Sequence, residues 1–191
     1  MIKKLLLPII LFVYAIATYA QSEIKCEINT ASGMILIELY PEKAPKTVAN
    51  FLNYVRNKDY DGSTFFRVCT PENEAEREVQ IQVIQGGDMA EEKLFLPIQI
   101  ETTKQTGLKH LRGAISMARG EPNSAQSSFF ICVTDEPELD FGGERNPDGF
   151  GFAAFGQVTE GMDIVEKIQQ GENEQQMLVH PVRIESIRII E

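Results

Sequence analysis

The sequence has little of what common catalytic machinery requires. Its 191 residues include no Trp, two His and three Cys. It contains no H-E-x-x-H, C-x-x-C, G-x-S-x-G or Walker lysine motif, and these absences exclude the signatures of zinc peptidases, dithiol oxidoreductases, α/β-hydrolases and P-loop nucleotide hydrolases. His110 and His180 lie in polar stretches, and Ser127 and Ser128 have no histidine nearby in the sequence. We expect no metal ion and no cofactor.

Basic residues are also scarce. Lys and Arg number 18 against 28 Asp and Glu, which gives a net charge of −10. Because phosphate binding needs a basic face, this balance argues against nucleic acid or anionic lipid as a partner. Hydrophobic content of 43% and a length of 191 residues are typical of one globular domain with a sizeable core.

Only one apolar run is long, and it lies at the N-terminus. Lys3 and Lys4 precede an apolar stretch over residues 5–17, which is too short for a stable membrane span. Thr18-Tyr19-Ala20 then places small residues before a cleavage point. The pattern predicts a signal peptide over residues 1–20 and a mature domain over residues 21–191. The alternative is an uncleaved anchor.

The three cysteines, Cys26, Cys69 and Cys132, form an odd set. An exported protein enters an oxidising compartment, where disulfides can form. All three lie in apolar or alternating runs, which favours buried free thiols. One disulfide with one free thiol is the alternative.

Alternating and helical periodicities predict a mainly β domain. Residues 23–29 and 34–40 predict a hairpin, and residues 44–57 and 161–170 predict two amphipathic helices. A last strand over residues 182–189 is interrupted at Glu185-Ser186, which suggests a bulge. Further short strands are expected over residues 64–68, 79–85, 113–118, 128–133 and 153–158. Many short strands with two helices indicate an antiparallel barrel or sandwich.

Two segments are interpreted as insertions. Residues 70–78 carry four glutamates and only Arg77 as a basic residue, so we expect a solvated loop. Residues 140–151 are rich in Gly, Asp and Asn and resemble the start of a calcium loop, but Phe155 occupies the position of the bidentate Glu. A turn explains this composition better.

An ordered series of short motifs runs from about residue 34 to residue 165. Its members are Ala44-Pro45-Lys46-Thr47-Val48-Ala49-Asn50-Phe51, Tyr60-Asp61-Gly62-Ser63-Thr64-Phe65-Phe66-Arg67-Val68, Gln85-Gly86-Gly87-Asp88, Gly113-Ala114-Ile115-Ser116-Met117-Ala118, Ser127-Ser128-Phe129-Phe130-Ile131, Leu139-Asp140, Ala154-Phe155-Gly156-Gln157-Val158 and Glu160-Gly161-Met162-Asp163-Ile164-Val165. Each motif is weak alone, but together and in this order they resemble the cyclophilin family of peptidyl-prolyl isomerases. The resemblance implies a closed eight-stranded antiparallel β-barrel capped by two α-helices.

The resemblance also implies roles for individual residues. Arg67 matches the catalytic arginine and Gln85 its polar partner. Arg67 is then the only convergent charge expected in the pocket. The substrate-binding positions are Phe66, Val83, Ala118, Arg119, Phe130, Leu139 and Phe152. Ala118 and Arg119 match a stretch whose backbone binds the peptide.

Four positions depart from the usual family pattern. Phe66 stands where many members have His, Gln82 where an aromatic residue is usual, Ser128 where Gln is common, and Glu138 where many have Trp. These changes leave the arginine, the glutamine and most of the apolar pocket in place.

We therefore expect an exported peptidyl-prolyl cis-trans isomerase that acts on proline-containing segments of folding proteins. A periplasmic location is favoured over secretion into the medium. The expected protein is a monomer with no stable membrane insertion after signal removal. The alternative function is a non-catalytic peptide-binding module or holdase on the same fold.

Overall fold

A computed structural model describes residues 23–190, so the predicted signal peptide lies outside the described residues. The strands are β1 (Ile24–Thr30), β2 (Gly33–Leu39), β3 (Thr64–Cys69), β4 (Val83–Gly86), β5 (Ala114–Met117), β6 (Phe129–Cys132), β7 (Ala153–Glu160), β8 (Asn173–Glu174) and β9 (Met177–Ile190). The helices are α1 (Pro45–Asn57), α2 (Thr103–Thr106) and α3 (Met162–Gln169), with two 3₁₀ turns, η1 (Glu91–Lys93) and η2 (Pro137–Leu139).

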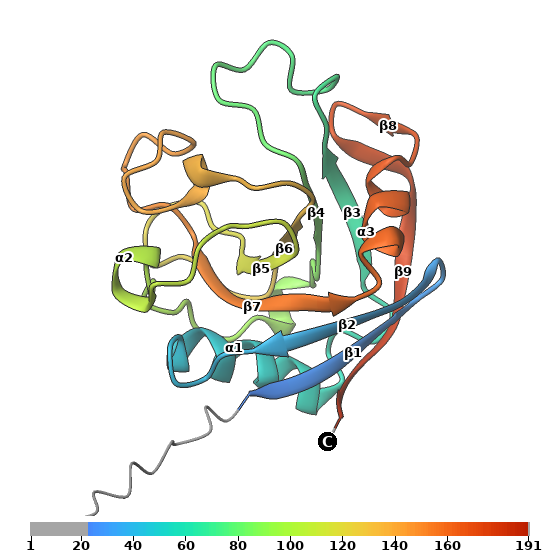
Figure 1. Cartoon of the computed structure of the whole chain (residues 1–191). Coiled ribbons are helices and arrows are strands. Elements are labelled where there is room, and N and C mark those ends of the chain that lie inside the picture. Colours follow the sequence, from blue (N-terminus) through green and yellow to red (C-terminus); the bar gives the residue numbers. More distant parts are fainter. Residues whose placement is uncertain (1–22, 191) are drawn as a thin grey trace, which may run out of the picture.

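The strands form a closed antiparallel barrel, as predicted. Their order is β1-β2-β7-β5-β6-β4-β3-β9, and β1 also pairs with β9, which closes the sheet on itself (Figure 1). β8 only extends the end of β9. The predicted β1–β2 hairpin is present, and it has a two-residue turn because Thr30 pairs with Gly33. Across β1 and β9 the partners shift from Asn29–Ser186 to Thr30–Ile184, so Glu185 is the bulged residue.

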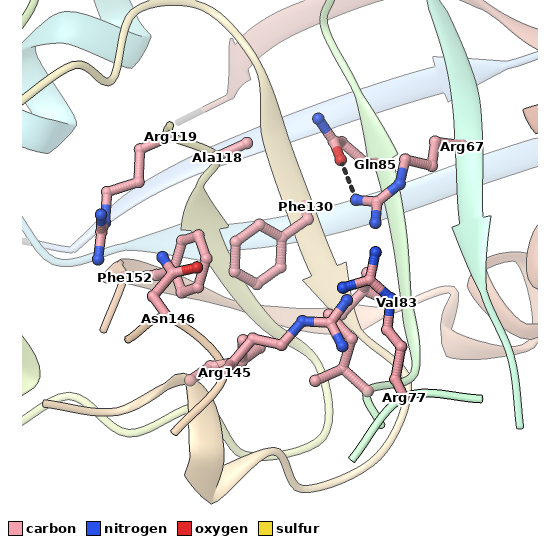
Figure 2. Close-up of a pocket in the computed structure, with 12 residues that line it drawn as sticks. Arg67, Arg77, Val83, Gln85, Ala118, Arg119, Phe130, Arg145, Asn146 and Phe152 are labelled. Carbon is pink, nitrogen blue, oxygen red and sulfur yellow. Dashed lines mark hydrogen bonds between the residues drawn. The ribbon is translucent and has the colours of Figure 1, made fainter. Parts of the chain in front are cut away.

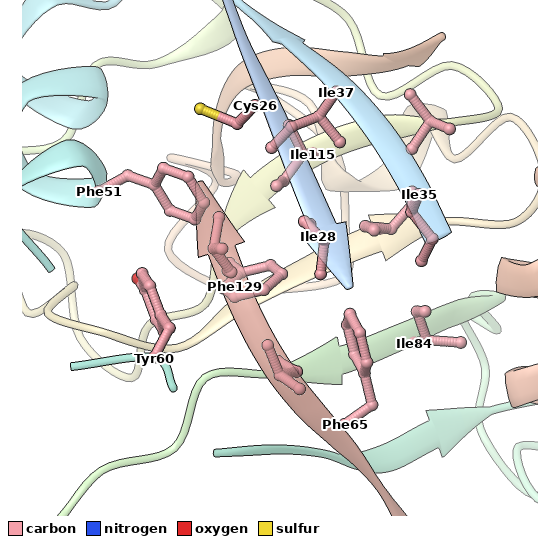
Figure 3. Close-up of a cluster of buried hydrophobic side chains, with 14 of the residues drawn as sticks. Cys26, Ile28, Ile35, Ile37, Phe51, Tyr60, Phe65, Ile84, Ile115 and Phe129 are labelled. Carbon is pink, nitrogen blue, oxygen red and sulfur yellow. The ribbon is translucent and has the colours of Figure 1, made fainter. Parts of the chain in front are cut away.

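The two predicted helices pack on different strands of the barrel. α1 contacts β7 and β9, and α3 contacts β2, β3 and β4. Both contribute buried side chains to one core inside the barrel, where Phe51, Tyr60, Phe65 and Phe129 lie among aliphatic residues (Figure 3). Within residues 23–190, no helix has the length and apolar character that a membrane span requires.

A residue far along the chain, Glu101, caps the start of α1. The helix has Pro45 in its first turn and no side-chain cap of its own. Instead the Glu101 carboxylate accepts the backbone N–H groups of Lys46 at 3.2 Å and Thr47 at 2.8 Å. A negative group at a helix N-terminus also complements the helix dipole. α3 begins after Gly161, whose φ of 88° and close approach to Met34 O leave no room for a side chain.

The strand expected over residues 79–85 is shorter than predicted and begins at Val83. The preceding backbone is held by side chains: Ile81 N–H donates to the Glu74 carboxylate at 3.3 Å, and Gln82 N–H donates to the Glu136 carboxylate at 2.8 Å. These bonds replace part of the sheet ladder. The expected short strands elsewhere are confirmed to within a few residues at each end.

Candidate active site

A bulge in β3 sets the direction of the Arg67 side chain. Phe65 pairs with Gly86 of β4, but Arg67 pairs with Gln85, so Phe66 is an extra residue on one strand. A bulge of this kind re-aims the residues on either side of it. Phe65 enters the barrel core, whereas Arg67 lies on the outer face. Gly86 makes this possible, because a Cβ there would lie 2.7 Å from the Phe65 ring.

Three strands bring three of the predicted site residues into one row. Arg67 of β3 pairs with Gln85 of β4, and Gln85 pairs with Phe130 of β6. Directly paired residues in an antiparallel sheet point to the same face. Arg67 Nη1 donates a hydrogen bond to Gln85 Oε1 at 2.7 Å, so the predicted arginine–glutamine pair is present (Figure 2).

A second glutamine, Gln176, holds the other edge of the Arg67 guanidinium. Its Oε1 accepts Arg67 Nε at 2.9 Å and Nη2 at 2.6 Å. Gln176 lies in the two-residue turn between β8 and β9, where Gln175 and Gln176 have φ values of 49° and 77°. Turns of this kind normally use Asn or Gly. The sequence carries no such signal at this turn, and Gln176 was therefore missed.

The row borders a cavity of about 390 Å³. Its apolar walls are Ile81, Val83, Ala118, Phe130, Leu139 and Phe152. The rings of Phe130 and Phe152 meet edge to face, with centroids 5.4 Å apart. The pocket therefore has a firm aromatic wall and a fixed cation on its border.

A second, more open groove of about 280 Å³ continues from the first and shares Gln85, Ala118 and Arg119 with it. Ser128 lies along this groove. The Arg119 side chain also contributes to the site. It donates hydrogen bonds to both Asp148 carboxylate oxygens at 2.8 Å, and its Cζ atom lies 5.1 Å from the centroid of the Phe152 ring. Asp148, part of the incomplete calcium-like motif, thus serves as an ion-pair partner.

Of the nine predicted site residues, eight border the first cavity and Phe66 borders neither hollow. The bulge explains this correction, because Phe66 is the extra residue between the two paired positions. Gln82 borders a different, polar hollow, and Glu138 accepts the backbone N–H of Glu144 at 2.8 Å.

The interpretation of residues 70–78 as a solvated loop is wrong at its centre. Glu74 is fully buried and pairs with Arg145, whose side chain is 8% exposed. The Glu74 carboxylate also accepts Gln176 Nε2 at 2.5 Å. Burial raises the pKa of Glu74, but the hydrogen bond and charge of Arg145 outweigh it, so the pKa lies below its usual value. The two segments interpreted as insertions are therefore joined to each other and to the Arg67 network.

The expectation that Arg67 is the only charge in the pocket is also wrong. Arg77, Arg119 and Arg145 border the same cavity. Arg77 belongs to a segment for which the sequence predicts a solvated loop, and Arg145 belongs to a segment for which it predicts a turn. Arg77 and Arg145 reach the site only because these two segments pack against each other.

His110 lies in a polar stretch of the sequence, but its side chain is buried behind the pocket. Its Nδ1 contacts Asp140 Oδ1 at 2.9 Å, its Nε2 contacts Ser116 Oγ at 2.9 Å, and its ring stacks with Phe130 at 5.9 Å between centroids. Ser116 has no exposed surface. The arrangement therefore supports the pocket wall and offers no accessible nucleophile.

The sequence profile of the family described as "Cyclophilin type peptidyl-prolyl cis-trans isomerase/CLD" matches residues 24–189. The chain belongs to the cyclophilin family. It is 40% identical over 174 residues to the peptidyl-prolyl cis-trans isomerase cyp18 of Streptomyces antibioticus, covering 86% of this chain and 97% of the relative. It is 38% identical over 146 residues to peptidyl-prolyl cis-trans isomerase B of Escherichia coli, covering 74% and 81%.

The fold agrees with solved cyclophilins. The crystal structure of a cyclophilin-type isomerase from Cryptosporidium parvum superposes with a TM-score of 0.70 at 22% identity, covering 88% of this chain and 98% of that one. This cyclophilin is a peptidyl-prolyl cis-trans isomerase, as predicted. The alternative of a non-catalytic binding module has no support in these comparisons.

Proposed function

We propose that this cyclophilin accelerates rotation about X-Pro bonds in exported proteins and that Arg67 is its catalytic residue. The observation that carries the proposal is the fixed Arg67 guanidinium at the border of an apolar cavity. Three of its nitrogen atoms are hydrogen-bonded to the side chains of Gln85 and Gln176.

The reaction needs an electrostatic catalyst and no nucleophile. Resonance opposes rotation about the peptide bond with a barrier of about 18–20 kcal/mol, and an X-Pro bond exchanges isomers only over tens of seconds or more. As the bond twists, the proline nitrogen becomes pyramidal and its lone pair localises. A guanidinium beside that nitrogen stabilises the twisted state more than the planar one, which lowers the barrier.

The partners of Arg67 suit this role. In the described residues its side-chain hydrogen bonds go only to amide oxygens. A carboxylate would orient the guanidinium equally well but would neutralise its charge. Two amides fix the direction and leave the charge available for the substrate, while the wall formed by Phe130, Leu139 and Phe152 can hold the proline ring during rotation.

The test is turnover of a proline peptide by Arg67→Ala and Arg67→Lys variants of the mature chain. We expect Arg67→Ala to lose about 10²-fold or more in kcat. Arg67→Lys should also be poor, because a flexible ammonium cannot bond both glutamines as the planar guanidinium does. Arg56→Ala, at an exposed position of α1, is the matched control. Near-normal turnover by a folded Arg67→Ala protein would contradict the proposed role.

Export to the periplasm and a monomeric state are part of the same proposal. The support for export is the sequence pattern of residues 1–20. N-terminal sequencing of protein recovered from a periplasmic fraction should begin at Gln21, and light scattering of the mature chain should give the mass of one copy. A start at Met1 in the cytoplasmic fraction would contradict the export proposal.

A further inference from the structure

Four arginines border the cavity of a strongly acidic protein. They are Arg67, Arg77, Arg119 and Arg145, whereas no Asp or Glu among residues 23–190 borders the same cavity. The whole chain carries a net charge of −10. Four of the 18 basic residues therefore gather at this cavity, and they come from four different segments.

Only part of this charge is neutralised. Arg119 has Asp148 to itself, held by two hydrogen bonds of 2.8 Å. Arg77 and Arg145 share one carboxylate, that of Glu74. Since Arg67 is bonded to amides, the side of the cavity formed by Arg67, Arg77 and Arg145 carries three positive charges against one negative charge. The guanidinium groups on this side therefore outnumber the one carboxylate that pairs with them.

Arg77 is the member of this group that is free to meet a ligand. Its side chain is 56% exposed, whereas that of Arg145 is 8% exposed. The Arg77–Glu74 ion pair uses Nε at 3.3 Å, and the two terminal nitrogens make no hydrogen bond to any residue between 23 and 190. Figure 2 shows the Arg77 guanidinium between the guanidinium groups of Arg67 and Arg145. All three arginines border the cavity that Phe130 also lines.

The three guanidinium groups are kept together by buried bonds. Glu74 pairs with Arg145, and Arg145 also donates to the carbonyl of Val79 at 2.5 Å, which ties its loop to the segment that carries Arg77. Like charges in solution would separate. Their proximity therefore requires this framework and leaves an attraction for an anion that reaches the cavity border.

We infer that this site selects proline segments that carry an acidic side chain within two residues of the proline, and that Arg77 is the residue that recognises the carboxylate. The inference rests on the proposed function and names its substrate class. The apolar wall takes the proline ring, so the anion must be attached to the same segment, and Arg77 stands where a neighbouring side chain can reach it. A contact pair at a partly exposed position is worth a several-fold preference.

The test compares pairs of proline peptides. The two members of a pair differ only in having Glu or Gln at one position, which is one of the two positions before the proline or one of the two after it. We expect kcat/KM for the Glu peptide to exceed that for the Gln peptide by about fivefold at the best position, at about 0.15 M salt. The gain should lie in KM. In about 1 M salt, where the screening length is about 3 Å, the preference should shrink.

Arg77→Gln should remove the preference, so that the ratio of kcat/KM for the Glu peptide to kcat/KM for the Gln peptide falls to about one. Arg112→Gln is the matched control, because Arg112 is also about half exposed and paired with a carboxylate, that of Glu166, but does not border the cavity. Arg112→Gln should keep the full preference. Arg77→Lys should keep part of it.

The outcomes separate this inference from the isomerase proposal. Equal turnover of Glu and Gln peptides by the unmodified protein overturns the inference and leaves the isomerase activity standing. A preference that survives in Arg77→Gln, or an equal loss on both peptides, shows that Arg77 does not recognise the carboxylate. Failure on every peptide contradicts the proposed function itself. The salt dependence is measured on the unmodified protein, so it tests the inference even if Arg77→Gln does not fold.

Discussion

The direction of one side chain, Arg67, depends on residues that are distant in the sequence. Gln176 accepts two of its N–H groups, Glu74 accepts the amide of Gln176, and Arg145 fixes Glu74. Gln176 adopts a left-handed backbone conformation that L side chains rarely take. Strain of this kind persists where the surrounding structure enforces it, and here it delivers an amide oxygen to the guanidinium.

The role of Gln176 can be separated from that of its turn. We expect Gln176→Ala to lower kcat by about tenfold, because Arg67 loses one of its two fixed partners and samples other directions. Gln175→Ala is the control, since Gln175 also has positive φ but makes no side-chain hydrogen bond to the described residues. Steady-state kinetics on one proline peptide is the measurement. An equal loss in both variants would mean that only the turn matters.

The buried His110 gives a prediction about pH. Burial lowers the pKa of His110, and the hydrogen bond and charge of Asp140 oppose this only in part. The unfolded chain, with a His pKa of about 6.5, therefore binds this proton more readily than the folded one. The free energy of unfolding should be independent of His110 above about pH 6.5. At lower pH it should decrease, by up to about 1.4 kcal/mol per pH unit. Asp140, whose pKa is lowered, stays charged through this window.

Urea unfolding between about pH 5 and pH 8 measures this effect. His110→Gln should reduce the loss of unfolding free energy below about pH 6.5. His180→Gln, at an exposed position, should leave that loss unchanged. Activity should vary little between about pH 6 and pH 8, because no histidine borders the cavity. A loss that persists in His110→Gln would assign it to another group.

At the scale of elements, α1 shows how a sequence pattern becomes a packed helix. The predicted apolar stripe includes Phe51, which is fully buried and contacts the rings of Tyr60, Phe129 and Phe155 at 5.2–5.5 Å between centroids. Those rings come from the following loop, β6 and β7. One aromatic cluster thus helps to attach the helix to the barrel.

Phe51→Ala should lower the free energy of unfolding by about 3–5 kcal/mol, because it removes a large buried ring and leaves a cavity among rigid neighbours. Asn53→Ala, on the exposed side of the same helix, should change it by less than about 0.5 kcal/mol. Thermal or urea unfolding followed by circular dichroism provides the comparison. A similar effect of the two substitutions would show that the aromatic cluster does not help to attach the helix.

The elements that could be predicted are those with a strong local pattern. The β1–β2 hairpin, α1, α3 and the bulge at Glu185 each follow from periodicity or its interruption. In the site, the residues that could be predicted are those that lie within a single strand or motif, such as Arg67 and Gln85. Glu74, Arg145 and Gln176 were missed because their partners are 71 to 109 residues away in the sequence and their own segments look like loops.

At the scale of the whole molecule, the closed barrel determines the state of the cysteines. Cys69 and Cys132 both pair with Val83, one from each side, so a whole strand separates them. Strands lie about 4.8 Å apart, so two steps exceed the roughly 7 Å limit between the Cα atoms of a disulfide. All three cysteines are buried and free, which agrees with the interpretation as packed thiols.

Burial also makes these thiols unreactive. It raises the pKa of Cys26 to about 12 and that of Cys69 to about 11, and it raises the pKa of Cys132 well above its usual value. Because the thiolate is the reactive form, a thiol reagent at about pH 8 should modify none of the three in the folded protein within minutes. Unfolding in denaturant without reductant should release all three together, since β1, β3 and β6 belong to one closed sheet. Rapid modification of the folded protein would show local opening of one strand, and a count of one thiol after unfolding would show that two of the cysteines form a disulfide.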